Sequence, residues 1–274
     1  MARIAFITCY IGKFPWYFKY FVQSCRYNPT VDFYIISDNR TFDCELPKNV
    51  IPVYNTLAEI RELASQKLQL QAAIDRPYKL CDFKPAYGLL FSDIVAGYDF
   101  WAHGDIDVIF GNIRAFITDE LTNTYDLISV RHDFLTGYFL LYRNCEKMNL
   151  LFTHSKDYKK VMSDTKHYCF DETNFHFSEF ERGMHYSDIP SDVESMTHVV
   201  KRLDEAGYIK AYFDFHVIEG AYGKLRWDNG KLMYKNKYEA ILYHMIHFKT
   251  RCKPEDQLPV PPEVFRISPS RIYA

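Results

Sequence analysis

The chain has 274 residues, of which 48% are hydrophobic and 25% charged, and this composition excludes wholesale disorder. Lysine and arginine total 33 against 35 aspartate and glutamate residues, so the formal charge of -2 gives no overall basic field for nucleic-acid binding. No apolar run approaches the roughly 18 residues that span a bilayer, and the first nine residues lack the features of a secretory leader.

The first forty residues predict a strand, a helix and a second strand. Ile4–Cys9 is an apolar run with β-branched residues, as in a buried strand. Residues 14–27 are rich in aromatic side chains and predict a helix, with Pro15 tolerated in its first turn. Residues 33–36 predict a second buried strand. This order favours a parallel sheet covered by helices.

The later elements follow from periodicity and turn signals. Gly207 is expected to end the helix before it, and Asn229-Gly230 predicts a hairpin. From Pro254 onward the proline-rich end predicts irregular structure. The expected helices are 56–74, 84–96, 144–154 and 191–206, and the expected strands are 98–103, 127–130, 138–142 and 240–247. Together they predict one α/β domain with a Rossmann-like, mixed, mostly parallel sheet flanked by helices.

The sharpest chemical signal is an acidic pair directly after a strand. Asp105 and Asp107 follow the apolar run 98–103 and are separated by Ile106. In extended backbone, side chains two residues apart point the same way, so both carboxylates can face one point while Ile106 faces the core. At the carboxyl end of a strand, where open α/β sheets bind ligands, two carboxylates suit Mg²⁺ or Mn²⁺ with a diphosphate. A solvated acidic turn is the alternative.

A second cluster lies near the end of the chain. His244, His247 and Lys249 fall within six residues after an apolar run. Imidazole suits Mn²⁺ better than Mg²⁺, and a lysine can reach a phosphate as a point charge. Histidines that only pack in the core are the alternative, and a role for His244 in a metal site stays open. Seven scattered cysteines without a Cys-x-x-Cys pair favour reduced thiols, and so a cytoplasmic protein.

These two segments together resemble those of nucleotide-sugar glycosyltransferases with the GT-A fold, in particular the glycogenin and galactosyltransferase-like group and bacterial polysaccharide-cluster transferases. The resemblance rests on the Asp-x-Asp of Asp105 and Asp107 and on the late element His247, Phe248 and Lys249. It implies that Asp105, Asp107 and His247 bind Mn²⁺ (or Mg²⁺), that the metal holds the diphosphate of a UDP-sugar, and that Lys249 contacts a phosphate. It also implies a GT-A-like catalytic domain over residues 1–250, with a nucleotide-binding half to about 110, an acceptor half after it, and a C-terminal tail over 251–274.

The resemblance also assigns residues around the uridine and the phosphates. Thr8, Tyr10 and Ile11, in the first strand-to-helix loop, and Asp38, after the second strand, are expected beside the uridine. Lys84 is expected near the donor sugar and phosphates. The alternatives are a turn acid for Asp38, simple packing for Tyr10 and a solvated side chain for Lys84.

Two further segments resemble those that contact the donor and acceptor sugars in this group. Residues 134–139 resemble the Asn-x-Gly segment near the donor and acceptor sugars, with Thr136 in place of the expected Asn or Ser. Asp171 and Glu172 resemble the acidic segment that faces the donor sugar, although Asp171 can also be a helix cap. If the reaction inverts the anomeric centre, Asp171 or Glu172 is the candidate base for the acceptor hydroxyl. The resemblance leans to retention, which needs no such base.

The sequence therefore predicts a metal-dependent enzyme that moves a hexose, galactose or glucose by analogy, from a UDP-sugar to a sugar hydroxyl in polysaccharide, capsule or other surface glycan assembly. The alternatives are a nucleotidyltransferase that makes nucleotide-sugars, or a non-catalytic glycan-binding or scaffold protein. The nucleotidyltransferase is disfavoured because such enzymes usually carry a glycine-rich basic loop after the first strand. Here that loop holds only Gly12 and Lys13. A lipid-linked acceptor and peripheral membrane contact through the aromatic residues 13–21 form a minor hypothesis, since that stretch also suits a core helix.

Overall fold

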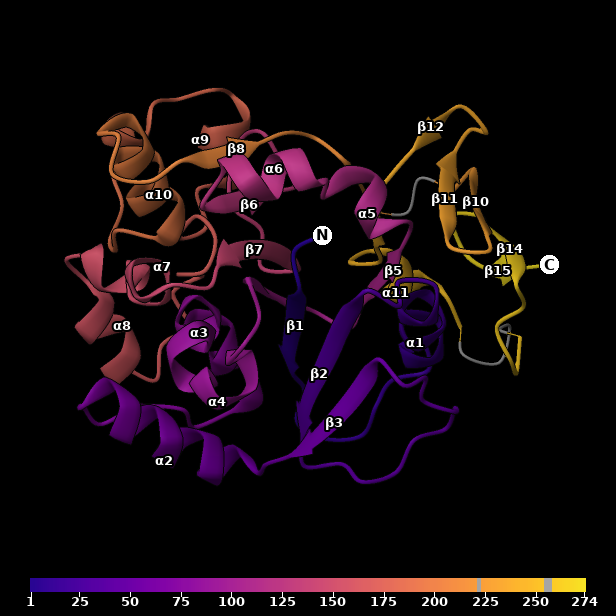
Figure 1. Cartoon of the computed structure of the whole chain (residues 1–274), viewed down its shortest axis with the longest axis horizontal. Helices are drawn as coiled ribbons and strands as arrows, with labels where there is room; N and C mark the ends of the chain where they lie inside the picture. Colours follow the sequence, from indigo (N-terminus) through magenta and orange to yellow (C-terminus); the bar gives the residue numbers. More distant parts are fainter. Residues whose placement is uncertain (221–222, 254–257) are drawn as a thin grey trace.

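A seven-stranded sheet forms the centre of the computed structural model, which describes residues 1–220, 223–253 and 258–274 (Figure 1). The strand order is β3-β2-β1-β4-β7-β6-β8, and every neighbouring pair is parallel except the two that β7 makes. The predicted mixed, mostly parallel sheet is thus confirmed. Its strands are β1 (Ile4–Cys9), β2 (Val31–Ser37), β3 (Val50–Tyr54), β4 (Phe100–Gly104), β6 (Leu127–Ser129), β7 (Phe139–Arg143) and β8 (Ala211–Phe213).

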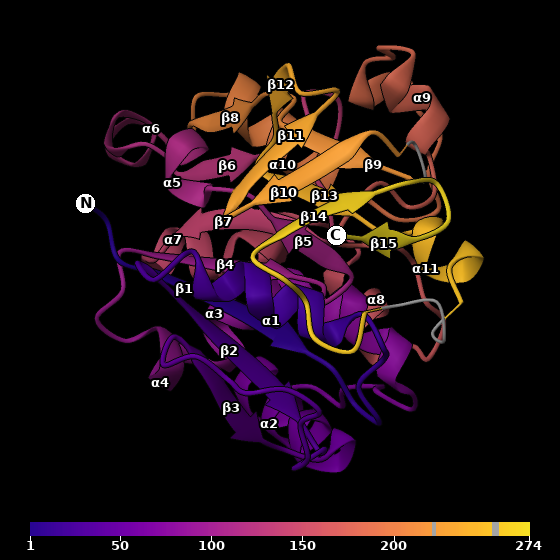
Figure 2. The same cartoon turned by 90° about the vertical axis from the view of Figure 1, so that its right-hand side faces the viewer.

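Helices cover both faces of this sheet, because its strands bury side chains on both sides. In β1, Ala5 and Ile7 join the core on one face, and Ile4 and Phe6 join the core on the other. The first face packs against α2, η1, α3, α4, α7, η2, α8 and α10, and the second against α1 and α5 (Figure 2). The helices, with η for a 3-10 helix, are α1 (Phe18–Arg26), α2 (Leu57–Leu68), η1 (Pro77–Ala86), α3 (Tyr87–Leu90), α4 (Ser92–Val95), α5 (Ile113–Phe116), α6 (Asp119–Thr124), α7 (Glu146–Asn149), η2 (Leu151–His154), α8 (Tyr158–Ser163), α9 (Phe177–Glu181), η3 (Tyr186–Asp188), α10 (Met196–Glu205) and α11 (Phe248–Arg251).

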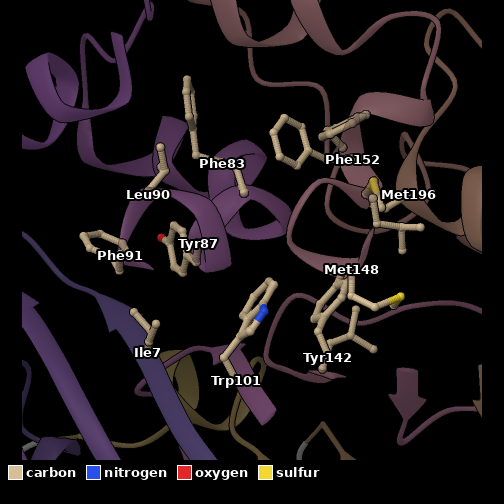
Figure 3. Close-up of a cluster of buried hydrophobic side chains, with 14 of the residues drawn as sticks. Ile7, Phe83, Tyr87, Leu90, Phe91, Trp101, Tyr142, Met148, Phe152 and Met196 are labelled. Carbon is tan, nitrogen blue, oxygen red and sulfur yellow. The ribbon is translucent and has the colours of Figure 1, made fainter. Parts of the chain in front are cut away.

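The core on the first face fixes the position of η1. Phe83 of η1 and Tyr87 of α3 point into a cluster that contains Trp101 and Tyr142 (Figure 3). The rings of Trp101 and Tyr142 stack with centroids 4.3 Å apart, between neighbouring strands β4 and β7. Because Phe83 is anchored in this core, the next residue, Lys84, is held near the end of β4.

The helix expected over 56–74 begins as predicted and ends early. Thr56 caps α2, since its side chain accepts a hydrogen bond from the Glu59 amide and the Glu59 carboxylate accepts one from the Thr56 amide. The helix stops at Leu68 because Gln69 adopts a left-handed backbone, with φ 53°. Ala72 and Ile74 are still buried, so the apolar pattern continues beyond the helix that it predicted.

The single helix expected over 84–96 is wrong. Pro77–Ala86 forms the 3-10 helix η1, with Pro85 inside it, and two short helices, α3 and α4, follow. The division between α3 and α4 lies at Phe91, whose φ of -105° and ψ of 37° depart from helical geometry. Helices 14–27, 144–154 and 191–206 are also shorter or divided, and Gly207 has the left-handed φ of 69° expected after α10.

Two smaller sheets complete the fold. One has the order β12-β11-β10-β14-β15, and the other β5-β13-β9. The predicted hairpin is confirmed: Asn229 and Gly230, with φ of 47° and 86°, join β10 to β11. The expectation of an irregular tail is wrong for β14 and β15, since β14 pairs with β10, whereas Pro254 lies outside the described residues. The strands are β5 (Val108–Phe110), β9 (Val217–Glu219), β10 (Leu225–Asp228), β11 (Lys231–Tyr234), β12 (Tyr238–Glu239), β13 (Leu242–His244), β14 (Val264–Ile267) and β15 (Ile272–Tyr273).

The aromatic stretch 13–21 packs largely inside the protein. Phe14, Phe18 and Phe21 are buried against the second face of the sheet. Among the described residues, no helix combines the length and the apolar character that a bilayer crossing requires.

Candidate functional site

A cavity of about 570 Å³ lies at the carboxyl end of β4. Its walls come from η1, the segment after β4, the segment before β7, residues 167–181 and the end of β13. Eight of the candidate residues named from the sequence line this one cavity: Lys84, Asp105, Asp107, Asp171, Glu172, His244, His247 and Lys249. The structure therefore brings together segments that are far apart along the chain.

The acidic pair faces the cavity because of the backbone at the end of β4. Ile106 is buried in the core, and Asp105 and Asp107 line the cavity on either side of it, as the two-residue spacing predicts. Gly104 ends the strand where no side chain fits, since a Cβ there would lie 2.4 Å from the carbonyl oxygen of Tyr138. The Asp107 carboxylate is almost fully buried, whereas that of Asp105 is 39% exposed.

Pairing between β5 and β13 brings the late cluster to the acidic pair. His244 pairs with Val108 across these strands, and the Met245 amide donates to the Asp107 carbonyl at 2.8 Å. As a result the His244 Nε2 lies 3.5 Å from the Asp107 carboxylate, and Lys249 Nζ donates to it at 2.6 Å. His247 is exposed, precedes α11 and lines the same cavity.

Alternating charges run from this contact along one wall. His244 lies between Asp107 and Glu219, with Nδ1 3.4 Å from Glu219, and Glu219 in turn accepts from Arg131. Burial disfavours the charged imidazole, but the two carboxylates outweigh it and raise the pKa of His244 to about 9. Burial likewise opposes ionisation of Asp107, yet His244 and Lys249 hold its pKa well below the usual range. The pair is therefore ionised near neutral pH.

Lys84 joins three of the segments. Its ammonium group donates to Asp105 at 2.7 Å and to the Gly137 carbonyl at 2.8 Å, and lies 3.6 Å from the Asp171 carboxylate. The side chain is only 6% exposed. Burial lowers the pKa of Lys84, but Asp105, Cys81 and Asp171 outweigh this and raise it. Lys84 is therefore a buried, fixed positive charge between the acidic pair and the 169–175 segment.

Two neighbouring carboxylates in the 169–175 segment also line the cavity, and of these Asp171 is buried and Glu172 half-buried. Burial raises the pKa of both Asp171 and Glu172, although Lys84 opposes the rise for Asp171 and the Gly137 amide, which donates to Glu172 at 2.6 Å, opposes it for Glu172. Gly137 is required here, because a Cβ would lie 2.5 Å from Asp171 Oδ2. Carboxyl groups with raised pKa in a cavity are suited to proton transfer.

The residues expected beside a uridine do not line this cavity. Thr8 is buried in β1, and the Asp38 carboxylate accepts from the Gly12 amide at 2.7 Å, as a turn acid does. Tyr10 and Ile11 are half-buried, and the Tyr10 ring stacks on Phe14. Burial raises the pKa of Tyr10, and the charges of Lys249 and Asp107 also act on its hydroxyl. These residues therefore flank the site at the ends of β1 and β2.

The hydroxyl of Thr136 hydrogen-bonds to the backbone and not into the cavity. It is fully buried, and its Oγ1 donates to the Phe139 carbonyl at 2.7 Å. The neighbouring Gly137, not Thr136, lines the cavity.

The cavity has an excess of negative charge. Of the described residues that line it, six are carboxylates and three are lysine or arginine. In residues 1–220, 223–253 and 258–274, no group of three or more His, Cys, Asp or Glu side chains is arranged to hold a metal ion, so the set Asp105, Asp107 and His247 stays a prediction. The six carboxylates are Asp105, Asp107, Asp171, Glu172, Glu181 and Glu219; the lysines and arginine are Lys84, Arg131 and Lys249, and the charged His244 is a fourth cation.

Sequence reasoning missed several residues of this cavity. Arg131 donates from Nε to Asp133 at 2.8 Å and contacts Glu219 and Glu181, which lie 88 and 50 residues away in the chain. Tyr78 and His167 also line the cavity. No motif marks these residues; the signal available was the position of Arg131 just after the strand predicted over 127–130.

A comparison with curated proteins finds no match to this chain. Residues 6–274 match the model of a family described as a family of unknown function, DUF6625. The chain therefore belongs to the DUF6625 family.

Proposed function

We propose that this protein is a metal-dependent glycosyltransferase of GT-A type, which transfers a hexose from a UDP-sugar to a sugar hydroxyl. The observation that carries the proposal is the joint placement of Asp105 and Asp107 with Lys84 and Lys249 on one cavity, at the carboxyl end of a strand in a mostly parallel sheet. Carboxylates beside lysines suit a cation and a diphosphate together.

The residues present fit a divalent cation. Mg²⁺ and Mn²⁺ prefer oxygen ligands, and Mg²⁺ in phosphate-transfer sites is commonly held by one or two carboxylates together with the substrate phosphates. Asp105 and Asp107 would hold it, and His247 can add an imidazole, whereas His244 would have to release its proton first. When bound, the cation supplies positive charge to the diphosphate that leaves the sugar.

The two lysines act on the same diphosphate. Lys249 and Lys84 each donate to one aspartate, so each ammonium group stands beside a carboxylate proposed as a ligand. Each can donate to a phosphate oxygen from there and offset the charge that develops on the leaving UDP. The uridine is proposed to bind beside Tyr10, because the charges of Lys249 and Asp107 affect the pKa of the Tyr10 hydroxyl.

The acceptor side is assigned to Asp171 and Glu172. Asp171 is buried and Glu172 half-buried, and both line the cavity and have a raised pKa. In an inverting reaction, one of them accepts the proton of the acceptor hydroxyl. In a retaining reaction, the same pair positions the sugars by hydrogen bonding and takes no proton.

Release of UDP from UDP-glucose and UDP-galactose tests the proposal. We expect release in Mn²⁺, loss of it in EDTA, and loss of at least about 100-fold in Asp107→Asn. Asp192→Asn is the matched control, since the Asp192 carboxylate is 80% exposed and does not line the cavity.

Three outcomes separate the alternatives. Pyrophosphate formation from UTP and a sugar 1-phosphate would identify a nucleotidyltransferase. Glycan binding without any nucleotide-sugar turnover would identify a binding protein. UDP release that is equal with Mn²⁺ and with EDTA would contradict the metal-dependent proposal.

A further inference from the structure

Three aromatic rings form a row at the mouth of the cavity. Tyr78, His167 and Phe175, here called the aromatic rim, all line it. The His167 ring lies edge to face with both others, with centroids 4.6 Å from Tyr78 and 5.6 Å from Phe175. Tyr78 is 63% exposed and Phe175 56% exposed, so both outer rings present apolar surface to solvent.

The backbone holds Phe175 outward in an unfavourable conformation. Asn174 and Phe175 have φ of 54° and 68°, in the left-handed region that a bulky side chain rarely adopts. The turn is nevertheless anchored, because the Asn174 side chain donates to the Tyr168 carbonyl and accepts from Ser191, each at 2.8 Å. Residues held in an unfavourable backbone conformation often lie in ligand-binding sites, and a half-exposed ring at such a position is consistent with a binding role.

The imidazole of His167, the middle ring of the aromatic rim, is held in place by Asp82. His167 Nδ1 lies 3.2 Å from the Asp82 carboxylate, and the imidazole is only 11% exposed. Asp82 further accepts from the Tyr168 and Phe170 amides, which holds the chain that links His167 to Asp171. These contacts hold two of the three rings, His167 and Phe175, in place.

Hydrogen-bonding groups lie directly behind the rim. Asp171 and Glu172 precede Phe175 in the same segment and line the same cavity. Tyr78, on η1, lines the same cavity as these two carboxylates. Aromatic faces and carboxylates thus meet on one wall.

We propose that the aromatic rim binds a sugar ring of the acceptor, and that the acceptor is therefore a glycan chain. The inference rests on the proposed glycosyl transfer and adds the class of acceptor to it. A pyranose has an apolar face of C–H groups, which packs on the negative face of an aromatic ring, and a periphery of hydroxyls. A sugar stacked on the rim presents its hydroxyls to Asp171 and Glu172, which accept hydrogen bonds from them.

Binding of plain oligosaccharides tests the rim without any nucleotide. The probes are maltotriose, cellotriose and β-1,4-galactotriose, at up to 20 mM, followed by saturation-transfer NMR and calorimetric titration. We expect at least one of them to bind the wild-type protein, and Tyr78→Ala and Phe175→Ala to weaken that binding at least five-fold. The ring-retaining variants Tyr78→Phe and Phe175→Tyr should bind within two-fold of wild type.

Tyr238→Ala is the matched control. Tyr238 is 55% exposed but lies on β12 and does not line the cavity, so its removal should change nothing. Absence of binding to all three probes, or equal binding by the wild type and the alanine variants, would contradict the proposal that the aromatic rim binds a sugar. A wild-type dimer that dissociates in Phe175→Ala would also overturn it, since the ring would then serve a protein interface.

Failure of the rim and failure of the transferase are distinguishable. UDP-sugar hydrolysis without rim-dependent glycan binding removes the rim and leaves the transferase. Rim-dependent glycan binding without UDP-sugar hydrolysis supports the rim and removes the transferase.

Discussion

Two lysine–aspartate pairs start from the same 3-10 helix, η1, and differ in their surroundings. Lys79 and Asp82 are 2.8 Å apart, and neither side chain is exposed at all. Lys79 also donates to the carbonyls of Val161 and Lys166, so its bonds are made inside the protein. Lys84 and Asp105 are 2.7 Å apart, but the Asp105 carboxylate is 39% exposed to the cavity. We call these the closed pair and the open pair.

The difference separates a structural role from a chemical one. The closed pair joins η1 to residues 161–170, and neither of its members can exchange a partner without unfolding that contact. In the open pair, Lys84 keeps the Gly137 carbonyl and Asp171 as further partners, which leaves the Asp105 carboxylate able to take a new one. A site for a charged ligand needs the open arrangement, and the closed arrangement beside it keeps the wall in place.

The largest expected effect is on the free energy of unfolding, when the aspartate of each pair is replaced by asparagine. Asp82→Asn leaves Lys79 charged and buried without its counter-ion, which should lower the free energy of unfolding by about 3–5 kcal/mol. Asp105→Asn removes a carboxylate that is partly solvated, and should cost about 1 kcal/mol or less. Urea unfolding of both variants measures the difference. Equal losses would erase the distinction between the closed and the open pair.

A smaller effect on stability is expected when a side chain is added at Gly137, next to the open pair. In Gly137→Ala, the new Cβ meets Asp171 Oδ2 at 2.5 Å, Lys84 Nζ at 3.2 Å and Glu172 Oε1 at 3.3 Å. Displacement of these groups should cost about 1–3 kcal/mol of stability, as other overpacked sites do. UDP release should fall more than ten-fold, because Lys84 moves away from Asp105. A variant with wild-type melting temperature and wild-type activity would show that Lys84 is not held where the structure has it.

An effect of similar size concerns the pH dependence of the ion pair between His244 and Asp107. The pKa of His244 is raised to about 9 in the folded protein, above its unfolded value near 6.5, so the stabilisation is complete below about 6.5 and is lost as the pH rises through 9. The free energy of unfolding should therefore fall by about 1–3 kcal/mol between pH 6.5 and 9.5. Urea unfolding of wild type and His244→Gln measures it, and parallel pH dependences in the two proteins would contradict the ion pair.

The parts of the fold that were predicted from sequence have local signals. Ile4–Cys9 was found as a strand from its apolar residues, and the Asn229-Gly230 turn from its dipeptide. The alternation through Ile106 placed Asp105 and Asp107 on the same side, because strand geometry is a local property. Errors arose where tertiary contacts replaced local preference: β3 was missed, and residues 84–96 read as a helix because buried residues of separate short helices mimic its period.

The missing part of the site is non-local. Arg131 and Glu219 meet across 88 residues, and their sequence neighbourhoods contain no motif. The imidazole beside Asp107 belongs to His244 because β13 pairs with β5 in one particular register. A single sequence shows that two histidines lie near an apolar run, but strand register decides which one reaches the carboxylate.

The most direct test of the central claim is binding of Mn²⁺ at the acidic pair, measured from the electron paramagnetic resonance signal of free Mn²⁺. In the presence of UDP, wild-type protein should remove close to one equivalent of the signal, and Asp105→Asn and Asp107→Asn should weaken this binding at least ten-fold, with Asp192→Asn unchanged. We expect UDP and Mn²⁺ each to strengthen the binding of the other. Mn²⁺ binding that is equal in wild type, Asp105→Asn and Asp107→Asn, or absent from all of them, would contradict the central claim.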